Sequence, residues 1–285
     1  MNYKTLASSV RLVPAIVICL LIVIGLSGRN ALAEDYNLCG DNDEFTADFL
    51  LEDCTFKTTG VNPYFILKPG YQKVLESDEE KSVETVLCET KKINLNGRKI
   101  KTRVYEERAY EWDEEEEEWV LIEISKNWFA ICKETNAVYY FGEDSLDCED
   151  GFNDDDTCDD PDPTGSWEAG KNGAMPGLMM PGTFLLGSKY FQEWAPPAAV
   201  DRGENRAMGL EWPEEGDTEY TDCVLVIDTN PAEGGDACED DDAKTYCPGV
   251  GLVQDEDMEL VDSNFDGCDD DDDDDDDDEE EEEED

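Results

Sequence analysis

The sequence contains no histidine among its 285 residues. Catalysis that depends on an imidazole, including Ser-His-Asp and Cys-His arrangements, is therefore excluded, and so are zinc, copper or iron sites with histidine ligands. No two cysteines form a C-x-x-C pair, so neither a dithiol redox motif nor a zinc knuckle is indicated. Carboxylates remain as candidate catalytic groups, but the acidic residues are so numerous that the sequence does not select a pair.

Basic residues are scarce, because 21 Lys and Arg stand against 76 Asp and Glu, for a formal net charge of −55. Phosphate backbones are bound by clustered lysine and arginine, so no nucleic acid partner is expected, and anionic membrane surfaces are disfavoured for the same reason. The acidic residues concentrate in blocks at 113–118, 144–162, 236–242 and 269–285. Such acidity also fits a chain that stays soluble in a saline habitat, without a specific role for the blocks.

Long apolar runs are absent after residue 33, but the first 33 residues contain one. Arg11 precedes an apolar stretch from Leu12 to Leu26, and Ala31-Leu32-Ala33 forms a small-x-small site. This pattern is typical of a secretory signal peptide over residues 1–33, with a mature chain that starts at Glu34 in a secreted or periplasmic location. An uncleaved anchor is the alternative, although the run is shorter than the roughly 20 residues that span a bilayer. After signal cleavage no membrane contact is expected.

Eleven cysteines occur in the chain, and ten remain when Cys19 leaves with the signal. An even number in an exported chain indicates disulfides. Cys148 and Cys158 flank one acidic loop, and Cys238 and Cys247 flank another, so a local bridge across each loop is a candidate. The remaining connectivity stays open, and several cysteines packed as buried free thiols are the alternative.

Alternating apolar and polar residues predict a fold made mainly of β-strands. Asn96-Gly97 is a strong hairpin signal between expected strands at Ser82–Ile93 and Lys99–Trp112, and the acidic run at 113–118 forms the next turn. Further strands are expected at Tyr71–Glu76, Trp119–Lys133, Ala137–Phe141, Tyr190–Trp194, Asn205–Trp212, Tyr220–Thr229, Ala243–Cys247 and Gly251–Leu260. The prediction is an antiparallel meander that forms a curved sheet, a sandwich or a half-barrel, which the pattern does not separate.

The expected organisation is one structured domain with two less ordered ends. Residues 34–61 are a loosely structured leading segment, residues 62–262 a β-rich domain with an acidic insertion at 143–163, and residues 263–285 an acidic tail. The tail has too little apolar surface to offset the entropy cost of ordering, so we expect it to be disordered. Aromatic residues near the centre are expected in the core or in cross-strand pairs, not as a ligand platform: Trp128, Phe129, Tyr139, Tyr140 and Phe141.

Several short motifs follow one another along the chain. They are Asn62–Phe65 (NPYF), Lys68–Gly70 (KPG), Tyr140–Asp144 (YFGED), Gly165–Gly170 (GSWEAG), Pro176–Gly182 (PGLMMPG) and Pro248–Val253 (PGVGLV). In this order they resemble a broad family of uncharacterised exported bacterial proteins, over roughly residues 50–262. The resemblance implies a secreted or periplasmic β-rich body and supplies no catalytic residues. The cysteine-bearing acidic insertions and the tail depart from it.

The segment Asp262-Ser263-Asn264-Phe265-Asp266-Gly267 matches the start of a calcium loop, D-x-[DN]-x-[DN]-G. In such loops oxygens at positions one, three and five converge on one ion, and glycine at position six permits a sharp turn. The candidate ligands are Asp262, Asn264, Asp266, the backbone carbonyl of Cys268, and Asp273. The match is incomplete, because Asp273 stands where glutamate usually gives bidentate ligation. A short calcium loop and a solvated acidic tail without a defined site both remain open.

These observations predict an exported, non-catalytic β-protein with calcium as a candidate ligand of its acidic loops and tail. A further partner, a protein or a ligand, is expected, and the sequence does not identify it. No nucleophile elbow or phosphate loop indicates an enzyme. The alternative is a carboxylate-based hydrolase acting on glycans in the envelope or outside the cell, which needs two carboxyl groups about 5–10 Å apart across a cleft.

Overall fold

A computed structural model of the chain describes residues 44–148, 151–153, 155–213, 219–231 and 243–268. Most of these residues are in strands, and Leu51–Asp53 form the short 3-10 turn η2. The expected mainly β, antiparallel fold is confirmed. Within the described ranges no helix is long and apolar enough to cross a membrane. The expected signal at 1–33, the acidic block at 236–242 and the tail from residue 269 lie outside the described residues.

The first half of the sheet is a meander of long strands that pair in chain order. These are β4 (Tyr71–Glu76), β5 (Glu80–Leu95), β6 (Arg98–Asp113), β7 (Glu118–Cys132) and β8 (Val138–Asp147). Asn96 and Gly97 have φ angles of 53° and 91° and close the β5–β6 hairpin, as predicted. Asn94 Oδ1 accepts a hydrogen bond of 2.9 Å from the Gly97 N–H and so holds this turn. The acidic run at 113–118 contains the β6–β7 turn, as expected.

The second half is another meander, which contains one hairpin that the sequence pattern did not predict. Its strands are β11 (Lys189–Phe191), β12 (Arg202–Trp212), β13 (Tyr220–Thr229), β14 (Ala243–Cys247), β15 (Gly251–Asp255) and β16 (Met258–Phe265). The prediction of a single strand over Gly251–Leu260 is wrong, because the chain reverses at Glu256 and Asp257. Glu256 has a φ of 51°, and Asp255 faces Met258 across the turn.

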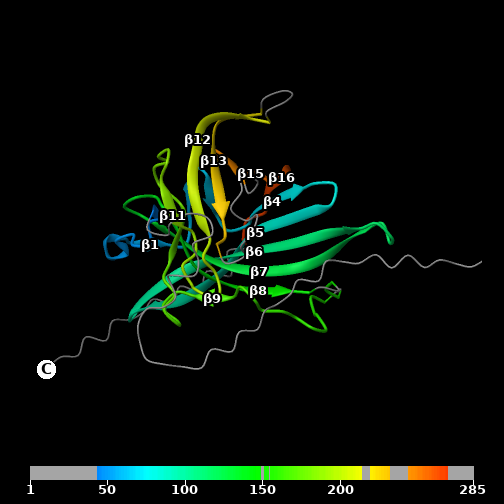
Figure 1. Ribbon diagram of the computed structural model, residues 1–285, viewed down its shortest axis with the longest axis horizontal. Helices are drawn as coiled ribbons and strands as arrows, with labels where there is room; N and C mark the ends of the chain where they lie inside the picture. Colours follow the sequence, from blue (N-terminus) through cyan, green and yellow to red (C-terminus); the bar gives the residue numbers. More distant parts are fainter. Residues whose placement is uncertain (1–43, 149–150, 154, 214–218, 232–242, 269–285) are drawn as a thin grey trace, which may run out of the picture. The chain divides into compact units, whose positions relative to one another are not determined.

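The two meanders form one curled sheet. β16 pairs antiparallel with β4, so the end of the second meander borders the start of the first. At the opposite end of the strand order, β10 (Gly177–Met180) pairs with β8 and contacts β11. Next to these strands, the Met175 N–H donates a hydrogen bond of 2.9 Å to the Trp194 carbonyl. In Figure 1 the strands β4 to β8 lie side by side and β12 and β13 run steeply beside them. Of the expected arrangements, this strand order is that of a curved sheet whose end strands approach each other.

Short elements pack against this sheet. β1 (Phe56–Lys57) pairs with β7, β9 (Trp167–Glu168) pairs with β8, and β2 (Gly60–Asn62) forms a small hairpin with β3 (Phe65–Leu67). β1 lies within the segment 34–61, which was expected to be loosely structured, and β2 begins there. At the other end, β16 continues to Phe265, past the expected domain limit at residue 262.

Four disulfides join the described cysteines, and they indicate an oxidising, extracellular or periplasmic environment. The expected bridge between Cys148 and Cys158 is confirmed. The expected bridge between Cys238 and Cys247 is wrong, because Cys247 pairs with Cys223 on the neighbouring strand β13. Spacing along the chain suggests the bridge between Cys238 and Cys247. The pairing of β13 with β14 instead brings Cys223 next to Cys247. The other two bridges are Cys54–Cys132 and Cys88–Cys268.

The hydrophobic core contains the central aromatic residues. Trp128, Phe129, Tyr139, Tyr140 and Phe141 are each at most 5% exposed, so their expected place in the core is confirmed. Phe129 and Tyr140 stack with ring centroids 4.6 Å apart. These residues pack where β7 meets β8, and the same two strands continue into the polar region described next.

Candidate functional site: a polar cavity inside the curled sheet

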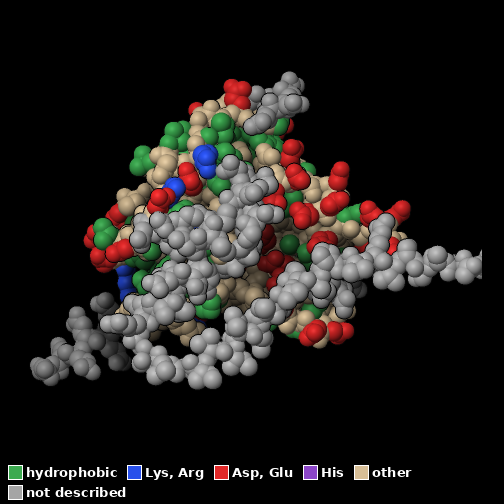
Figure 2. All heavy atoms as spheres, viewed as in Figure 1, with side chains coloured by type: hydrophobic (Ala, Val, Ile, Leu, Met, Phe, Trp, Pro, Cys, Tyr) green, Lys and Arg blue, Asp and Glu red, His purple; other side chains and the backbone are tan. Residues whose placement is uncertain are grey.

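A cavity of about 570 Å³ lies inside the curled sheet, lined by strands of both meanders. Its volume is in the range of small-molecule sites, about 300–1,000 Å³. Eleven acidic residues and three lysines are among its lining residues. Figure 2 shows acidic side chains around a hollow on this face, with further ones deeper inside it. The lining is therefore strongly acidic, and Phe129 and Tyr140 of the aromatic core also border it.

The polar lining comes from the alternation of side chains along three long strands. Successive residues of a strand point to opposite faces, and on β5, β6 and β7 a polar set faces the cavity. Register then brings these residues into rows across the sheet. Lys73 faces Glu84, Glu84 faces Glu107, and Glu107 faces Ser125. In the next row Tyr105 faces Asn127. Two carboxyl groups thus lie directly opposite each other, an arrangement that costs stability when both are charged.

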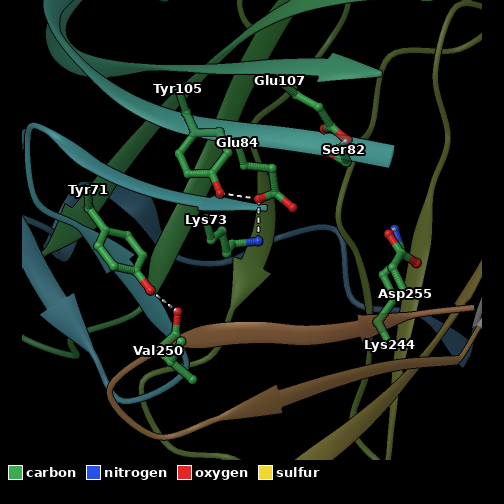
Figure 3. Close-up of polar contacts among 9 residues, drawn as sticks. All are labelled: Tyr71, Lys73, Ser82, Glu84, Tyr105, Glu107, Lys244, Val250 and Asp255. Carbon is green, nitrogen blue, oxygen red and sulfur yellow. Dashed lines mark hydrogen bonds and ion pairs between the residues drawn. The ribbon is translucent and has the colours of Figure 1, made fainter. Parts of the chain in front are cut away.

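Lys73, Glu84 and Tyr105 form a buried polar cluster at one side of the cavity (Figure 3). Both the Lys73 ammonium and the Tyr105 hydroxyl donate to Oε2 of Glu84. Lys73 and Glu84 are 4% and 8% exposed, so this ion pair is largely removed from water. Burial, followed by the charge of Glu84, raises the pKa of Tyr105 well above its usual value. A buried ion pair is weak evidence for stability alone, because desolvation opposes the attraction of the two charges.

Glu107 and Glu143 are acids whose protons titrate near neutral pH. Burial, followed by the carboxylates of Glu84 and Glu123, raises the pKa of Glu107 to about 8. Ser82 Oγ donates to Glu107 Oε1 at 3.1 Å. Burial also raises the pKa of Glu143 to about 7, although a hydrogen bond from the Tyr140 hydroxyl, 3.0 Å from Glu143 Oε2, opposes this shift.

Two more carboxyl groups of the lining have raised pKa values. Burial, followed by the nearby Asp201 carboxylate, raises the pKa of Glu193 well above its usual range. Burial, followed by the charge of Asp147, raises the pKa of Glu123, while a hydrogen bond of 3.0 Å from Ser145 Oγ opposes the shift. In both cases burial is the first cause of the raised pKa, and a neighbouring carboxylate adds to it.

The second meander contributes a lysine between two aspartates. Lys244 Nζ lies 3.3 Å from Asp228 Oδ2 and 3.4 Å from Asp255 Oδ2. The Asp255 carboxylate is the main reason that the pKa of Lys244 is raised well above its usual value. Burial nevertheless raises the pKa of Asp228 to about 6. Lys73 and Lys244 are both in ion pairs, and the third lining lysine, Lys81, lies 3.2 Å from Glu76. All three lysines of the lining are therefore already paired.

The chain matches no protein-family model, no curated protein and no solved structure. The suggested resemblance to exported β-rich proteins therefore stays a prediction, and the site must be interpreted from its own geometry.

The described residues of the cavity do not form a compact cluster of metal ligands. Among the residues in the described ranges, one group of three His, Cys, Asp or Glu side chains has ligand atoms within 4.8 Å of one another: Cys54, Cys132 and Glu134. Cys54 and Cys132 form a disulfide, so they present no thiolate to a metal. The carboxyl groups of the cavity are spread over its wall and do not converge in this way.

The residues predicted to bind calcium lie in and after β16. Asp262 and Asn264 are exposed residues of this strand, opposite Val74 and Gln72 of β4. The Asp266 N–H donates to the Gly70 carbonyl at 2.9 Å. Alternate residues of a strand point to one side at intervals of about 7 Å, so the segment is extended and does not curl around a point.

The last two predicted ligands are placed differently. Cys268 forms a disulfide with Cys88. Asp273 lies outside the described residues. Calcium binding at this segment stays a prediction.

The cavity residues were not singled out from the sequence. A signal was present, because Ser82 and Glu84 on one strand, and Glu123, Ser125 and Asn127 on another, repeat polar residues at every second position. Such a pattern is usually interpreted as a solvated face of a strand. Only the curling of the sheet, which depends on pairings distant in sequence, turns this face inward.

Proposed function

We propose that this protein is an exported, non-catalytic binding protein that holds a small organic cation in the cavity of its curled sheet. The observation that carries the proposal is the charge imbalance of the lining, which has eleven acidic residues against three paired lysines. A cationic ligand relieves the repulsion between these carboxyl groups, whereas an anion increases it. The four disulfides support a location outside the cytoplasm.

An organic cation fits the cavity better than a bare metal ion. A metal needs several ligand atoms around one point, and the cavity carboxyl groups do not converge in this way. The volume of about 570 Å³ also exceeds what one ion fills. Phe129, Met179 and Leu252 add apolar surface to the lining, which suits the carbon chain of an amine.

Calorimetry with linear diamines and spermidine tests this proposal on the full mature chain at physiological salt. We expect saturable binding of one molecule, no heat with citrate, and at least tenfold weaker binding in the Glu107→Gln, Glu123→Gln double variant. The matched control is Asp275→Asn with Asp276→Asn, which makes the same replacement of two acids by amides in the acidic run at 269–285. Equal loss in both variants, or non-saturating heat in the unmodified chain, overturns the proposal, because amines then bind only as counterions of a polyanion.

A hydrolase acting on glycans is a second candidate function. It is favoured by the raised pKa of Glu107, which keeps this acid protonated at neutral pH in the same cavity as Glu84 and Glu123. Glycoside hydrolysis uses one protonated and one ionised carboxyl group. A screen with nitrophenyl glycosides separates the two functions. Turnover that Glu107→Gln abolishes supports the hydrolase, and amine binding without turnover supports the binding protein.

A further inference from the structure

Three side chains of the cavity have a polar atom with no hydrogen-bond partner among the described residues. These atoms are Gln192 Oε1, Asp228 Oδ1 and the Tyr246 hydroxyl oxygen. Gln192 and Tyr246 are only 4% and 2% exposed, and all three residues line the cavity. Buried polar atoms are nearly always satisfied in native proteins, because an unpaired one costs free energy. The three atoms therefore indicate a bound molecule that forms hydrogen bonds with them.

The three residues lie in one region of the wall. Gly203 on β12 faces Asp228 on β13 in register. A Cβ atom on Gly203 would lie 3.2 Å from the side-chain amide carbon of Gln192, so Gln192 packs over this glycine. Tyr246 is two residues from Lys244 on β14 and so points to the same face, and Lys244 Nζ lies 3.3 Å from Asp228 Oδ2. The missing side chain at Gly203 lets Gln192 and the Tyr190 ring approach the backbone closely.

We infer that Gln192, Asp228 and Tyr246 bind a primary ammonium group at one end of the ligand. This inference rests on the proposed function and names the chemical class of the cation. The amide carbonyl of Gln192 and the carboxylate of Asp228 only accept hydrogen bonds, and the Tyr246 hydroxyl accepts one through its lone pairs. An ammonium group has three N–H donors and no acceptor, which matches three oxygen atoms. A quaternary ammonium has the same charge but no N–H donor.

The charges around this subsite favour a cation although Lys244 is close. Lys244 binds Oδ2 of Asp228 and leaves Oδ1 for the ligand. Asp255 also pairs with Lys244, at 3.4 Å. The carboxylate of Asp201 is near enough to act on the pKa of Asp228. One positive charge is thus set against three carboxyl groups, so the subsite stays negative when all are ionised.

A matched pair of ligands tests the inference by calorimetry on the full mature chain. The probes are 1,5-diaminopentane and its analogue with two trimethylammonium ends, which has the same chain and charge but no N–H donors. We expect the diamine to bind at least tenfold more tightly. Tyr246→Phe should weaken diamine binding about tenfold, the loss of one hydrogen bond to a charged group, and leave the quaternary analogue unchanged. Tyr139→Phe is the control, because Tyr139 is also buried but lies outside the cavity lining.

Tyr246→Phe removes a buried hydroxyl without a partner among the described residues, so it should not lower the melting temperature of the protein. A second variant, Gly203→Ala, should also weaken the diamine, because the new methyl group presses on Gln192 and on the Tyr190 ring 3.0 Å away. If diamine and quaternary analogue bind equally and neither variant matters, the subsite is wrong while the cavity proposal stands. If neither cation binds the unmodified protein, the proposed function itself fails.

Discussion

At the scale of single residues, the cavity is governed by carboxyl groups that face one another across the sheet. Glu107 faces Glu84 directly and lies near Glu123, and the ammonium of Lys244 offsets only part of their repulsion. Burial and these charges hold the pKa of Glu107 at about 8 and that of Glu143 at about 7. The charge inside the molecule therefore changes over the neutral pH range.

Replacing Glu107 with glutamine should change how stability depends on pH. Between the unfolded pKa of about 4.3 and the folded value of about 8, the folded protein holds a proton that the unfolded chain has released. The free energy of unfolding therefore falls as pH rises through this interval. Glu107→Gln removes this contribution, so relative to the unmodified protein it should gain up to about 4 kcal/mol between pH 5 and pH 9, from about 1.4 kcal/mol for each pH unit below the folded pKa. Urea unfolding at both pH values measures the difference.

The control for this prediction is Glu111→Gln, at the exposed end of the same strand. It makes the same change of side chain at an exposed position, and its stability is compared at the same two pH values. A Glu107→Gln protein that behaves like this control would show that the buried carboxyl group is not protonated.

The affinity for an amine should rise as the cavity acids ionise. Glu143 and Glu107 gain negative charge as pH passes about 7 and then about 8, whereas an alkyl diamine stays protonated up to about pH 10. Binding of 1,5-diaminopentane should therefore tighten between pH 6 and pH 9, by roughly tenfold for each carboxyl group that the ligand helps to ionise. Calorimetry at these two pH values checks this, and an affinity that is constant or falls with pH contradicts it.

At the scale of elements, strands could be predicted closely wherever a turn has a distinctive sequence. The expected limits of Tyr71–Glu76, Tyr220–Thr229 and Ala243–Cys247 agree with β4, β13 and β14. The turn at Glu256-Asp257 was missed, because two acidic residues give no glycine or proline signal. Local chemistry thus sets most of the strand limits, and an ordinary turn sequence hides one of them.

The candidate site could not be predicted in the same way, because a bulge intervenes between the hairpin turn and the cavity. Next to the turn Asn94 faces Lys99, and a straight continuation of that register would place Glu84 opposite Ala109. An irregularity between Val86 and Thr90 shifts the pairing by two residues, so Glu84 faces Glu107 instead. The acidic row exists only because of this shift, and the sequence has no clear marker for it.

The contact between β10 and β11 should be sensitive to a single methyl group. A Cβ atom on Gly177 would lie 1.8 Å from the backbone oxygen of Gln192, and backbone cannot move aside as a flexible side chain can. Gly177→Ala should therefore destabilise the protein by about 1–3 kcal/mol, measured by urea unfolding. In the control Gly267→Ala, the nearest atom belongs to the exposed Phe265 ring at 3.3 Å, and little change is expected. Equal stability of the two variants would argue against close packing of these strands.

At the scale of the whole molecule, one disulfide links the two meanders. Cys88 on β5 is bridged to Cys268, which follows β16, across a sequence separation of 180 residues. The Cys148–Cys158 bridge closes only a local loop, with a separation of 10 residues. A cross-link that closes a longer loop removes more conformational freedom from the unfolded chain.

Removing these two bridges should therefore have unequal effects. The Cys88→Ser, Cys268→Ser protein should lose roughly 2 kcal/mol more stability than the Cys148→Ser, Cys158→Ser protein, because loop entropy grows with the logarithm of loop length. Urea unfolding under non-reducing conditions compares the two double variants. Equal losses would indicate that contacts in the folded state, and not loop length, set the contribution of each bridge.

The pairing of β4 with β16 also determines at which stage of synthesis and folding the cavity forms. Its wall closes only when residues 259–265 reach residues 71–76, and a ribosome makes these two segments at nearly opposite ends of the described body. A nascent chain that lacks β16 has the acidic rows but no enclosure around them, so their charges remain dispersed in water. Contacts between such distant segments form late and slowly in folding. Ligand binding in the cavity therefore requires the fully folded protein. The last of the described strands to be synthesised, β16, is the one whose pairing with β4 closes the wall.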